Sequence, residues 1–186
     1  RVSQLKEMNN FLERVKRLFN VEDQERIVEA LNYAKLKHST QQRESGEPYI
    51  IHPIAVAEIL LDYGTDANTI IAALLHDVLE DTDTKISELK TLFGNDVSEI
   101  VNGVSRVKTL RYKSNENENS ESLRKMFIAM AKDIRVIMVK LADRLNNMRT
   151  LDNMSGEHKV RKSLDTRDVY IPIAERLGFG SIKGEL

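Results

Sequence analysis

The chain has 186 residues, of which 41% are hydrophobic and 31% charged, so a disordered chain is not expected. No apolar run reaches the ~18–20 residues of a spanning helix, so a membrane protein is not expected either. Its 28 basic and 29 acidic residues give a net charge of −1, which provides no general excess of positive charge for binding nucleic acid. Because it has no cysteine, a disulfide scaffold and a thiolate metal site are excluded, and we expect a cytoplasmic protein.

Apolar residues recur at helical spacing from the start of the chain. Steps of three and four predict a first amphipathic helix, whose buried stripe is formed by Leu5, Met8, Leu12, Val15 and Leu18. A second helix is predicted over residues 21–37, followed by an ordered loop over residues 38–50. The next helix is expected to have Pro53 in its first turn and to stop at Gly64.

The remaining predicted elements are also helices. A helix from residue 68 to Leu79 is apolar on nearly all sides, so we expect it to be central and buried. No segment alternates with a period of two, which predicts an all-α fold, a helical bundle. Further helices are predicted over residues 85–93, 96–107, 121–131, 134–151 and 160–177, with a polar loop over residues 113–120 and a bend at Pro172.

Ionisable residues lie inside two of the apolar helices, where a buried charge needs a partner. His76 and Asp77 are adjacent in one of them, and Asp143 lies within the other. With His52, which stands at a helix start, they form a mixed nitrogen and oxygen set whose negative charge balances that of a divalent ion. The sequence therefore predicts a metal site between central helices, with the ligands His52, His76, Asp77 and Asp143.

Two more carboxylates follow the His76–Asp77 pair. Glu80 is four residues after His76 and Asp81 four residues after Asp77, so all four side chains are expected at one end of one helix face. A divalent ion lowers the pKa of a water ligand to about 7 and holds a phosphate oxygen, which suits hydrolysis of phosphate esters. We therefore expect Glu80 and Asp81 to orient the attacking water or to accept its proton.

Five ordered blocks of the sequence resemble the hydrolase domain of the RelA/SpoT homologue family, bacterial enzymes that make and destroy the alarmone (p)ppGpp. They are GEPYIIHPIAVAEIL at 46–60, TIIAALLHDVLEDT at 69–82, FGNDVSEIVNGVSRV at 93–107, LRKMFIAMAKDIRVIMVKLADRLNNMRTL at 123–151 and VYIPIAERLG at 169–178. The resemblance covers the chain from about residue 20 to its end. It implies an all-helical HD-type domain that hydrolyses the 3′-pyrophosphate of (p)ppGpp to GDP or GTP and pyrophosphate.

The resemblance also implies the roles of individual residues. It assigns a Mn²⁺ ion to the four metal ligands and catalysis to Glu80 and Asp81. The choice of Mn²⁺ depends on the resemblance, because affinity alone does not separate Mn²⁺ from Fe²⁺ or Zn²⁺ at such ligands. Guanosine tetra- or pentaphosphate is expected to be bound by Arg43, Glu44, Ser45, Asn147, Thr150 and Tyr170. The chain departs from the family at Asn146, where members usually have His, and at Glu44, where many have a basic or small residue.

The same resemblance implies a domain organisation. Residues 1–177 are expected to form the hydrolase domain and residues 178–186 to begin the connection to a synthetase domain in cis; neither nucleic acid nor a membrane is an expected partner. Two other functions are alternatives. An HD phosphohydrolase of other nucleotides is opposed by the Arg43 loop with Asn147, and a non-catalytic alarmone-binding regulatory domain is opposed by the intact ionisable pairs.

Overall fold

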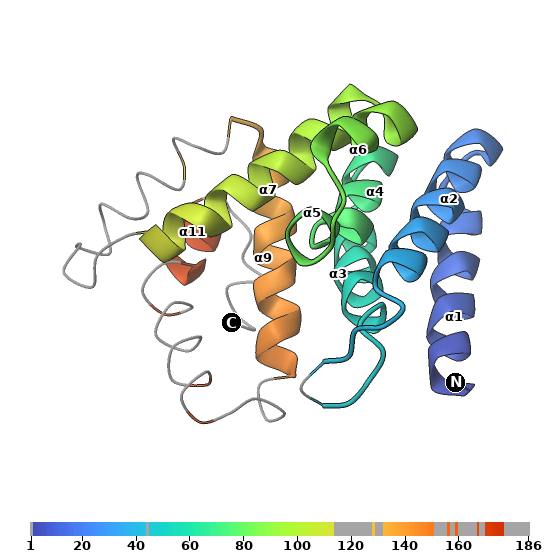
Figure 1. The fold of residues 1–186 in the computed structure, drawn as a ribbon, viewed down its shortest axis with the longest axis horizontal. Helices are drawn as coiled ribbons and strands as arrows, with labels where there is room; N and C mark the ends of the chain where they lie inside the picture. The colour runs from blue at the N-terminus through green and yellow to red at the C-terminus, as the bar shows by residue number, and fades with distance from the viewer. Residues whose placement is uncertain are drawn as a thin grey trace.

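The computed structural model describes residues 2–43, 45–113, 132–150 and 170–176, together with residues 128, 156, 159 and 167. The named elements in this part of the chain are all helices, so the all-α prediction is confirmed (Figure 1). Several predictions lie outside the described residues. They are the helix over residues 121–131 apart from residue 128, the loop over residues 114–120, most of the helix over residues 160–177, and residues 178–186.

The first two helices pack against each other at one end of the molecule (Figure 1). They are α1 (Val2–Leu18) and α2 (Val21–Lys37). The predicted stripe of α1 is only partly right, because Leu5 and Leu18 are 61% and 57% exposed whereas Phe11 is fully buried. Only the middle of α1 is buried in the core, so the buried stripe consists of Met8, Phe11 and Val15.

Two apolar helices form the centre of the fold. In α3 (Ile51–Asp62), Pro53 lies in the first turn, where its missing N–H costs no hydrogen bond, and Gly64 follows the helix with a φ of +66°. In α4 (Ala67–Leu75), all residues but one are buried, which confirms its predicted central position. The helix α3 packs against α4 and α9, and α4 also packs against α2 and α7.

The prediction of one continuous helix from residue 68 to Leu79 is wrong in its C-terminal part. The helix α4 ends at Leu75, His76 and Asp77 form a turn, and a short helix α5 (Val78–Asp81) follows. The reason is a side-chain hydrogen bond: His76 Nδ1 lies 2.6 Å from the carbonyl oxygen of Ala73 and competes for an acceptor of the helix ladder.

The later helices cover the central pair. They are α6 (Ile86–Phe93), α7 (Asn95–Lys113), α9 (Ile134–Arg149) and α11 (Ile171–Arg176). The helix α7 extends six residues beyond its predicted end and crosses the bundle next to α9 (Figure 1). In the described part of the last predicted helix, Pro172 lies in the first turn of α11. None of the described helices is long and apolar enough to cross a membrane.

Gly103 of α7 marks a close approach to α9. A Cβ atom at this position would lie 2.7 Å from Cγ2 of Val136, well inside van der Waals contact. We expect Gly103→Ala to lower the free energy of unfolding by about 1–2 kcal/mol, because the clash outweighs the higher helix propensity of alanine. Urea unfolding measures the loss, and a double variant with Val136→Ala should be more stable than the sum of the two single effects predicts. Unchanged stability of Gly103→Ala would contradict the close packing.

Candidate functional site

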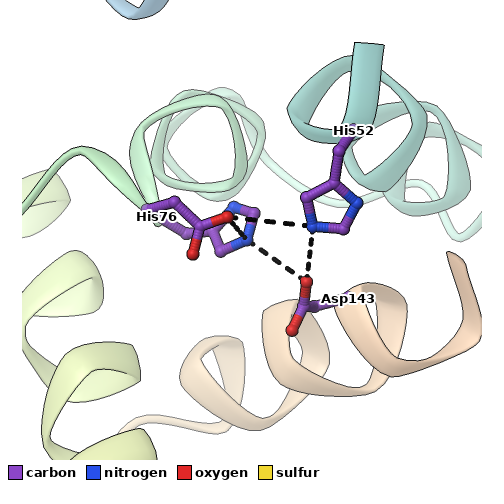
Figure 2. Close-up of side chains that lie close together, drawn as sticks. His52, His76 and Asp143 are labelled. Atoms are coloured by element: carbon purple, nitrogen blue, oxygen red, sulfur yellow. Dashed lines mark hydrogen bonds and ion pairs between the residues drawn. The ribbon is translucent and has the colours of Figure 1, made fainter. Parts of the chain in front are cut away.

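The four predicted metal ligands converge at the centre of the bundle. Figure 2 shows the rings of His52 and His76 turned toward the carboxylate of Asp143. His52 Nε2 and His76 Nε2 lie 2.7 and 3.3 Å from Asp143 Oδ1, and His76 Nε2 lies 2.9 Å from Asp77 Oδ2. The side chains of both histidines are at most 3% exposed, and those of both aspartates at most 13%.

Three elements supply these ligands. His52 is the second residue of α3, Asp143 lies in α9, and His76 and Asp77 form the turn between α4 and α5. In a continuous helix two neighbouring side chains point about 100° apart. Because the helix is interrupted here, both side chains of the pair face the same point.

The geometry fits a divalent cation. One ligand atom from each of the four residues lies within 4.8 Å of the others. Ligands at about 2.0–2.2 Å from an ion lie about 3–4.4 Å apart, so movements of less than 1 Å would bring these atoms into a coordination shell. In the described part of the chain His76 Nε2 is buried, and its neighbours are the carboxylate oxygens of Asp77 and Asp143. An imidazole nitrogen that faces two carboxylates is a suitable metal ligand once it has lost its hydrogen.

The charged side chains of the cluster shift one another's pKa values. Burial alone would lower the pKa of His76, but the carboxylates of Asp77 and Asp143 raise it well above its ordinary value. Burial would raise the pKa of both aspartates, but His76 lowers that of Asp77, and Lys140 and the histidines lower that of Asp143. Burial lowers the pKa of His52, outweighing Asp143. Without metal, the site therefore holds a charged His76 between two carboxylates.

These shifts predict how the stability of the metal-free protein depends on pH. The raised pKa of His76 contributes stability that is complete below the unfolded-state pKa of about 6.5 and is lost as pH rises through the folded-state pKa. The lowered pKa of His52 changes the stability only below about pH 6.5. The lowered pKa values of Asp77 and Asp143 change it only below about pH 4. We therefore expect the chelated protein to melt at lower temperature at about pH 8.5 than at about pH 6.5.

Calorimetry in the presence of a chelator measures the melting temperature at each pH. In the control variant His76→Gln, the melting temperature should change less between these two pH values. Saturating Mn²⁺ should oppose the decline, because His76 must lose its proton before it can bind an ion. If the melting temperature of the chelated wild type stayed constant or rose over this range, the charge assignment of His76 would be wrong.

The predicted proton carriers lie beside the cluster and contact residues that sequence reasoning did not single out. Glu80 Oε1 accepts a hydrogen bond of 2.9 Å from Ser105 Oγ of α7. The hydroxyl of Tyr49 lies 2.6 Å from Asp77 Oδ2 and 3.2 Å from Asp81 Oδ2, so it bridges a predicted metal ligand and a predicted proton carrier. Burial, followed by the Asp77 carboxylate, raises the pKa of Tyr49, which keeps this hydroxyl protonated.

Three of the predicted substrate residues meet at the C-terminal end of α9. Nη2 of Arg43 donates to Asn147 Oδ1 at 3.3 Å and to Thr150 Oγ1 at 3.2 Å. Asn147 also donates to Asp143 Oδ1 at 3.4 Å, which links this group to the predicted metal ligands. The loop that holds Arg43 is closed by a hydrogen bond of 2.9 Å from its N–H to the carbonyl oxygen of Glu47.

The other predicted substrate residues are placed differently. Ser45 is exposed and lies 3.5 Å from the carboxylate of Glu47, and Glu44 lies outside the described residues. Tyr170 is only 3% exposed, and the guanidinium of Arg144 lies 4.4 Å from its ring centre. Tyr170 therefore packs inside the bundle, and its role as a wall of the substrate pocket stays a prediction.

Two of the site residues that the sequence analysis did not name could have been found from their positions in the sequence. Lys140 is a lysine inside an apolar helix, three residues before Asp143, and its Nζ lies 3.4 Å from Asp143 Oδ2. Tyr49 precedes His52 by three residues at a helix start, so both side chains lie near one face. Ser105 carried no signal, because only the packing of α5 against α7 brings it to Glu80.

The chain is similar to known proteins over most of its length. A family model described as the HD domain matches residues 30–180. A probable guanosine-3′,5′-bis(diphosphate) 3′-pyrophosphohydrolase of Synechocystis sp. is 49% identical over 160 residues, which are 86% of this chain and 21% of that protein. The bifunctional (p)ppGpp synthase/hydrolase SpoT of Escherichia coli K12 is 46% identical over 166 residues, 89% of this chain and 24% of that protein.

A solved structure is similar to both the sequence and the fold. It is described as a metazoan orthologue of SpoT that hydrolyses ppGpp and plays a role in starvation responses. It matches with a TM-score of 0.60 and 31% identity, and the match covers 77% of this chain and 83% of that one. The match thus spans most of this neighbour's chain but less than a quarter of the two curated relatives.

Proposed function

We propose that this chain, which belongs to the HD domain family and within it to the RelA/SpoT homologues, hydrolyses the 3′-pyrophosphate of guanosine tetra- or pentaphosphate. The products are GDP or GTP and pyrophosphate. The observation that carries the proposal is the buried cluster of two histidines and two aspartates, next to which Arg43 approaches from another segment. The names of the similar proteins support the choice of substrate.

The proposed cofactor is one divalent ion, and Mn²⁺ is our choice by resemblance to the family. His52, His76, Asp77 and Asp143 would hold it. When bound, the ion supplies Lewis acidity toward a phosphate oxygen and the attacking water. The neutral and negative ligands together balance its charge once His76 has lost its proton.

The proton transfers are assigned to side chains of this chain. Water attacks the phosphorus attached to the ribose 3′-oxygen. The bond between this phosphorus and the 3′-oxygen breaks, and pyrophosphate is released. One proton of the attacking water passes to the carboxylate of Glu80 or Asp81, and the protonated carboxyl group returns it to the 3′-oxygen as the bond to phosphorus breaks. Ser105 and Tyr49 hold these two carboxylates in place through the hydrogen bonds at 2.9 and 3.2 Å.

Substrate recognition is assigned to the group at the end of α9. The guanidinium of Arg43 is directed there by neutral oxygens of Asn147 and Thr150, so an anionic phosphate is a stronger acceptor than its present partners. Asn147 offers both a donor and an acceptor, which suits the ribose or the base. The further substrate residues of this proposal are Glu44, Ser45 and Tyr170.

The proposed domain organisation places this activity within a larger protein. The two curated relatives extend far beyond the matched region, and one of them is named a bifunctional synthase/hydrolase. We propose that residues 1–177 form the hydrolase domain, that residues 178–186 begin the connection to a synthetase domain, and that the domain acts in the cytoplasm. A synthetase domain in cis is then its covalent partner.

Incubation with labelled ppGpp and Mn²⁺, followed by separation of the nucleotide products, tests the function. We expect GDP and pyrophosphate in equal amounts. GTP, dGTP and inorganic pyrophosphate serve as competing substrates, and faster turnover of any of them would favour a broader phosphohydrolase. Binding of ppGpp without any product would instead indicate a regulatory module.

Arg43 provides a test of substrate binding. A guanidinium can bind two phosphate oxygens at once, whereas an ammonium group acts as a single point charge. We expect Arg43→Lys to lower kcat/KM for ppGpp about 10- to 100-fold, the effect of losing about 1.5–3 kcal/mol from a charged hydrogen bond. Arg14→Lys, on a part-exposed arginine paired with Asp62, is the matched control and should behave as wild type. Unchanged kinetics of Arg43→Lys would remove Arg43 from the substrate site.

A further inference from the structure

The amide of Asn146 lies directly behind one of the proposed metal ligands. Asn146 follows Asp143 by three residues in α9 and is only 6% exposed. Its Nδ2 lies 2.6 Å from Nδ1 of His52, and on the other side of the same ring Nε2 lies 2.7 Å from Asp143 Oδ1. The two ring nitrogens of His52 therefore face two different residues of one helix.

The two histidines of the cluster differ in what holds them. His76 Nδ1 lies 2.6 Å from the carbonyl oxygen of Ala73, which can only accept a hydrogen bond. Nδ1 of His76 therefore carries a hydrogen. The partner of His52 is a side-chain amide, which can either donate through nitrogen or accept through oxygen. The position of the hydrogen on His52 thus depends on which way this amide is turned.

The arrangement in the structure is one of two consistent states. With Nδ2 of Asn146 donating to Nδ1 of His52, the hydrogen of a neutral ring is on Nε2 and points to Asp143. Metal ligation through Nε2 needs a lone pair there, so the hydrogen must be on Nδ1, and Nδ1 then needs an acceptor. A half-turn of the amide provides one, because its oxygen and nitrogen have nearly the same shape.

We propose that Asn146 is a positioning residue for His52, whose amide turns on metal binding to accept a hydrogen bond from Nδ1. The inference rests on the proposed function, because it takes His52 as a metal ligand. Metal binding then exchanges one complete set of hydrogen bonds for another. The His52 ring stays in place, and only the amide and the ring hydrogen change position.

Nuclear magnetic resonance of wild-type protein with ¹⁵N-labelled histidine tests the exchange without any variant. Two-bond ¹H–¹⁵N spectra distinguish hydrogen on Nδ1 from hydrogen on Nε2, and His52→Gln identifies the signals of His52. We expect His52 to carry its hydrogen on Nε2 in chelated protein and on Nδ1 with Zn²⁺, a diamagnetic probe. Hydrogen on Nδ1 in both states, or ligation of Zn²⁺ through Nδ1, would overturn the proposal.

Metal affinity of variants, measured by competition with a chelator, gives a second test. Asn146→Leu has no acceptor and should weaken binding about 10- to 100-fold, the usual effect of losing an outer partner of a ligand. Asn146→Asp keeps an acceptor and should bind at least as tightly as wild type. The matched control is Thr69→Val, which removes the buried hydroxyl that Thr69 donates to Asp66 at the far end of α4.

The outcomes separate this inference from the proposed function. If wild-type protein binds no divalent ion, the metal site itself fails. If wild type binds an ion and Asn146→Leu binds it equally tightly, or Asn146→Asp is weakened as much as Asn146→Leu, only the role of Asn146 is overturned. A loss of affinity confined to Asn146→Leu, with Thr69→Val unchanged, supports the proposal.

Discussion

The variant Asp77→Ala is expected to lose both the metal and the hydrolytic activity. In the wild type, the Asp77 carboxylate lies 2.9 Å from His76 Nε2 and would supply one of the four proposed ligand atoms and one of the two negative charges. Removal should cost more than the ~10- to 100-fold that loss of an outer partner of a ligand causes. Metal analysis of the purified variant and a product assay with labelled ppGpp measure both losses.

Thermal unfolding shows the same loss independently of activity. An ion that binds only the folded state stabilises it by about 2.7 kcal/mol at a concentration 100 times its dissociation constant. Chelation should therefore lower the melting temperature of wild type but not that of Asp77→Ala. Asp62→Ala, which removes an exposed aspartate at the other end of α3, should respond to chelation as wild type does. One bound ion per molecule in Asp77→Ala would refute the ligand assignment.

The variants Glu80→Gln and Asp81→Asn are expected to separate chemistry from metal binding. Both replacements keep the shape of the side chain but remove its ability to take up a proton. We expect hydrolysis to fall about 10²- to 10⁴-fold, the usual contribution of a general acid or base, while the fold and the metal content are kept. Rapid-quench measurement of a single turnover isolates the chemical step from product release.

Asp83→Asn is a suitable control for this pair, because its carboxylate is 92% exposed in the same acidic segment. It should keep full activity. A loss of metal in Glu80→Gln or Asp81→Asn equal to that in Asp77→Ala would place the affected residue among the ligands. Full activity in either variant would exclude that residue from proton transfer.

The helical class and the central helices were predictable because they depend on apolar periodicity. Residues that are apolar on all sides of a helix, such as Ile70, Ile71 and Leu74, have no stable place except inside a bundle, and the structure buries them completely. The ends of α1 were not predictable in this way. Leu5 and Leu18 continue the same period, but whether a neighbouring helix reaches them is decided by tertiary packing.

The candidate site was predictable where charge conflicts with burial. His76, Asp77 and Asp143 stand out because an apolar helix gives an ionisable group no water, and the structure brings them within reach of one another. The turn at His76 was not predictable from periodicity, because it depends on a hydrogen bond between the ring and the carbonyl oxygen of Ala73. The contact of Ser105 with Glu80 likewise exists only after α7 has packed.

The proposed metal ligands come from three segments that are far apart in sequence, at residues 52, 76–77 and 143. An unfolded chain would have to close two long loops to bring them together, and this entropic cost lowers its affinity for an ion. Because His52 lies in α3 and Asp143 in α9, a partly opened molecule in which these helices have separated keeps at most three of the four proposed ligands together. Release of the ion should consequently report the separation of these helices before the rest of the bundle unfolds.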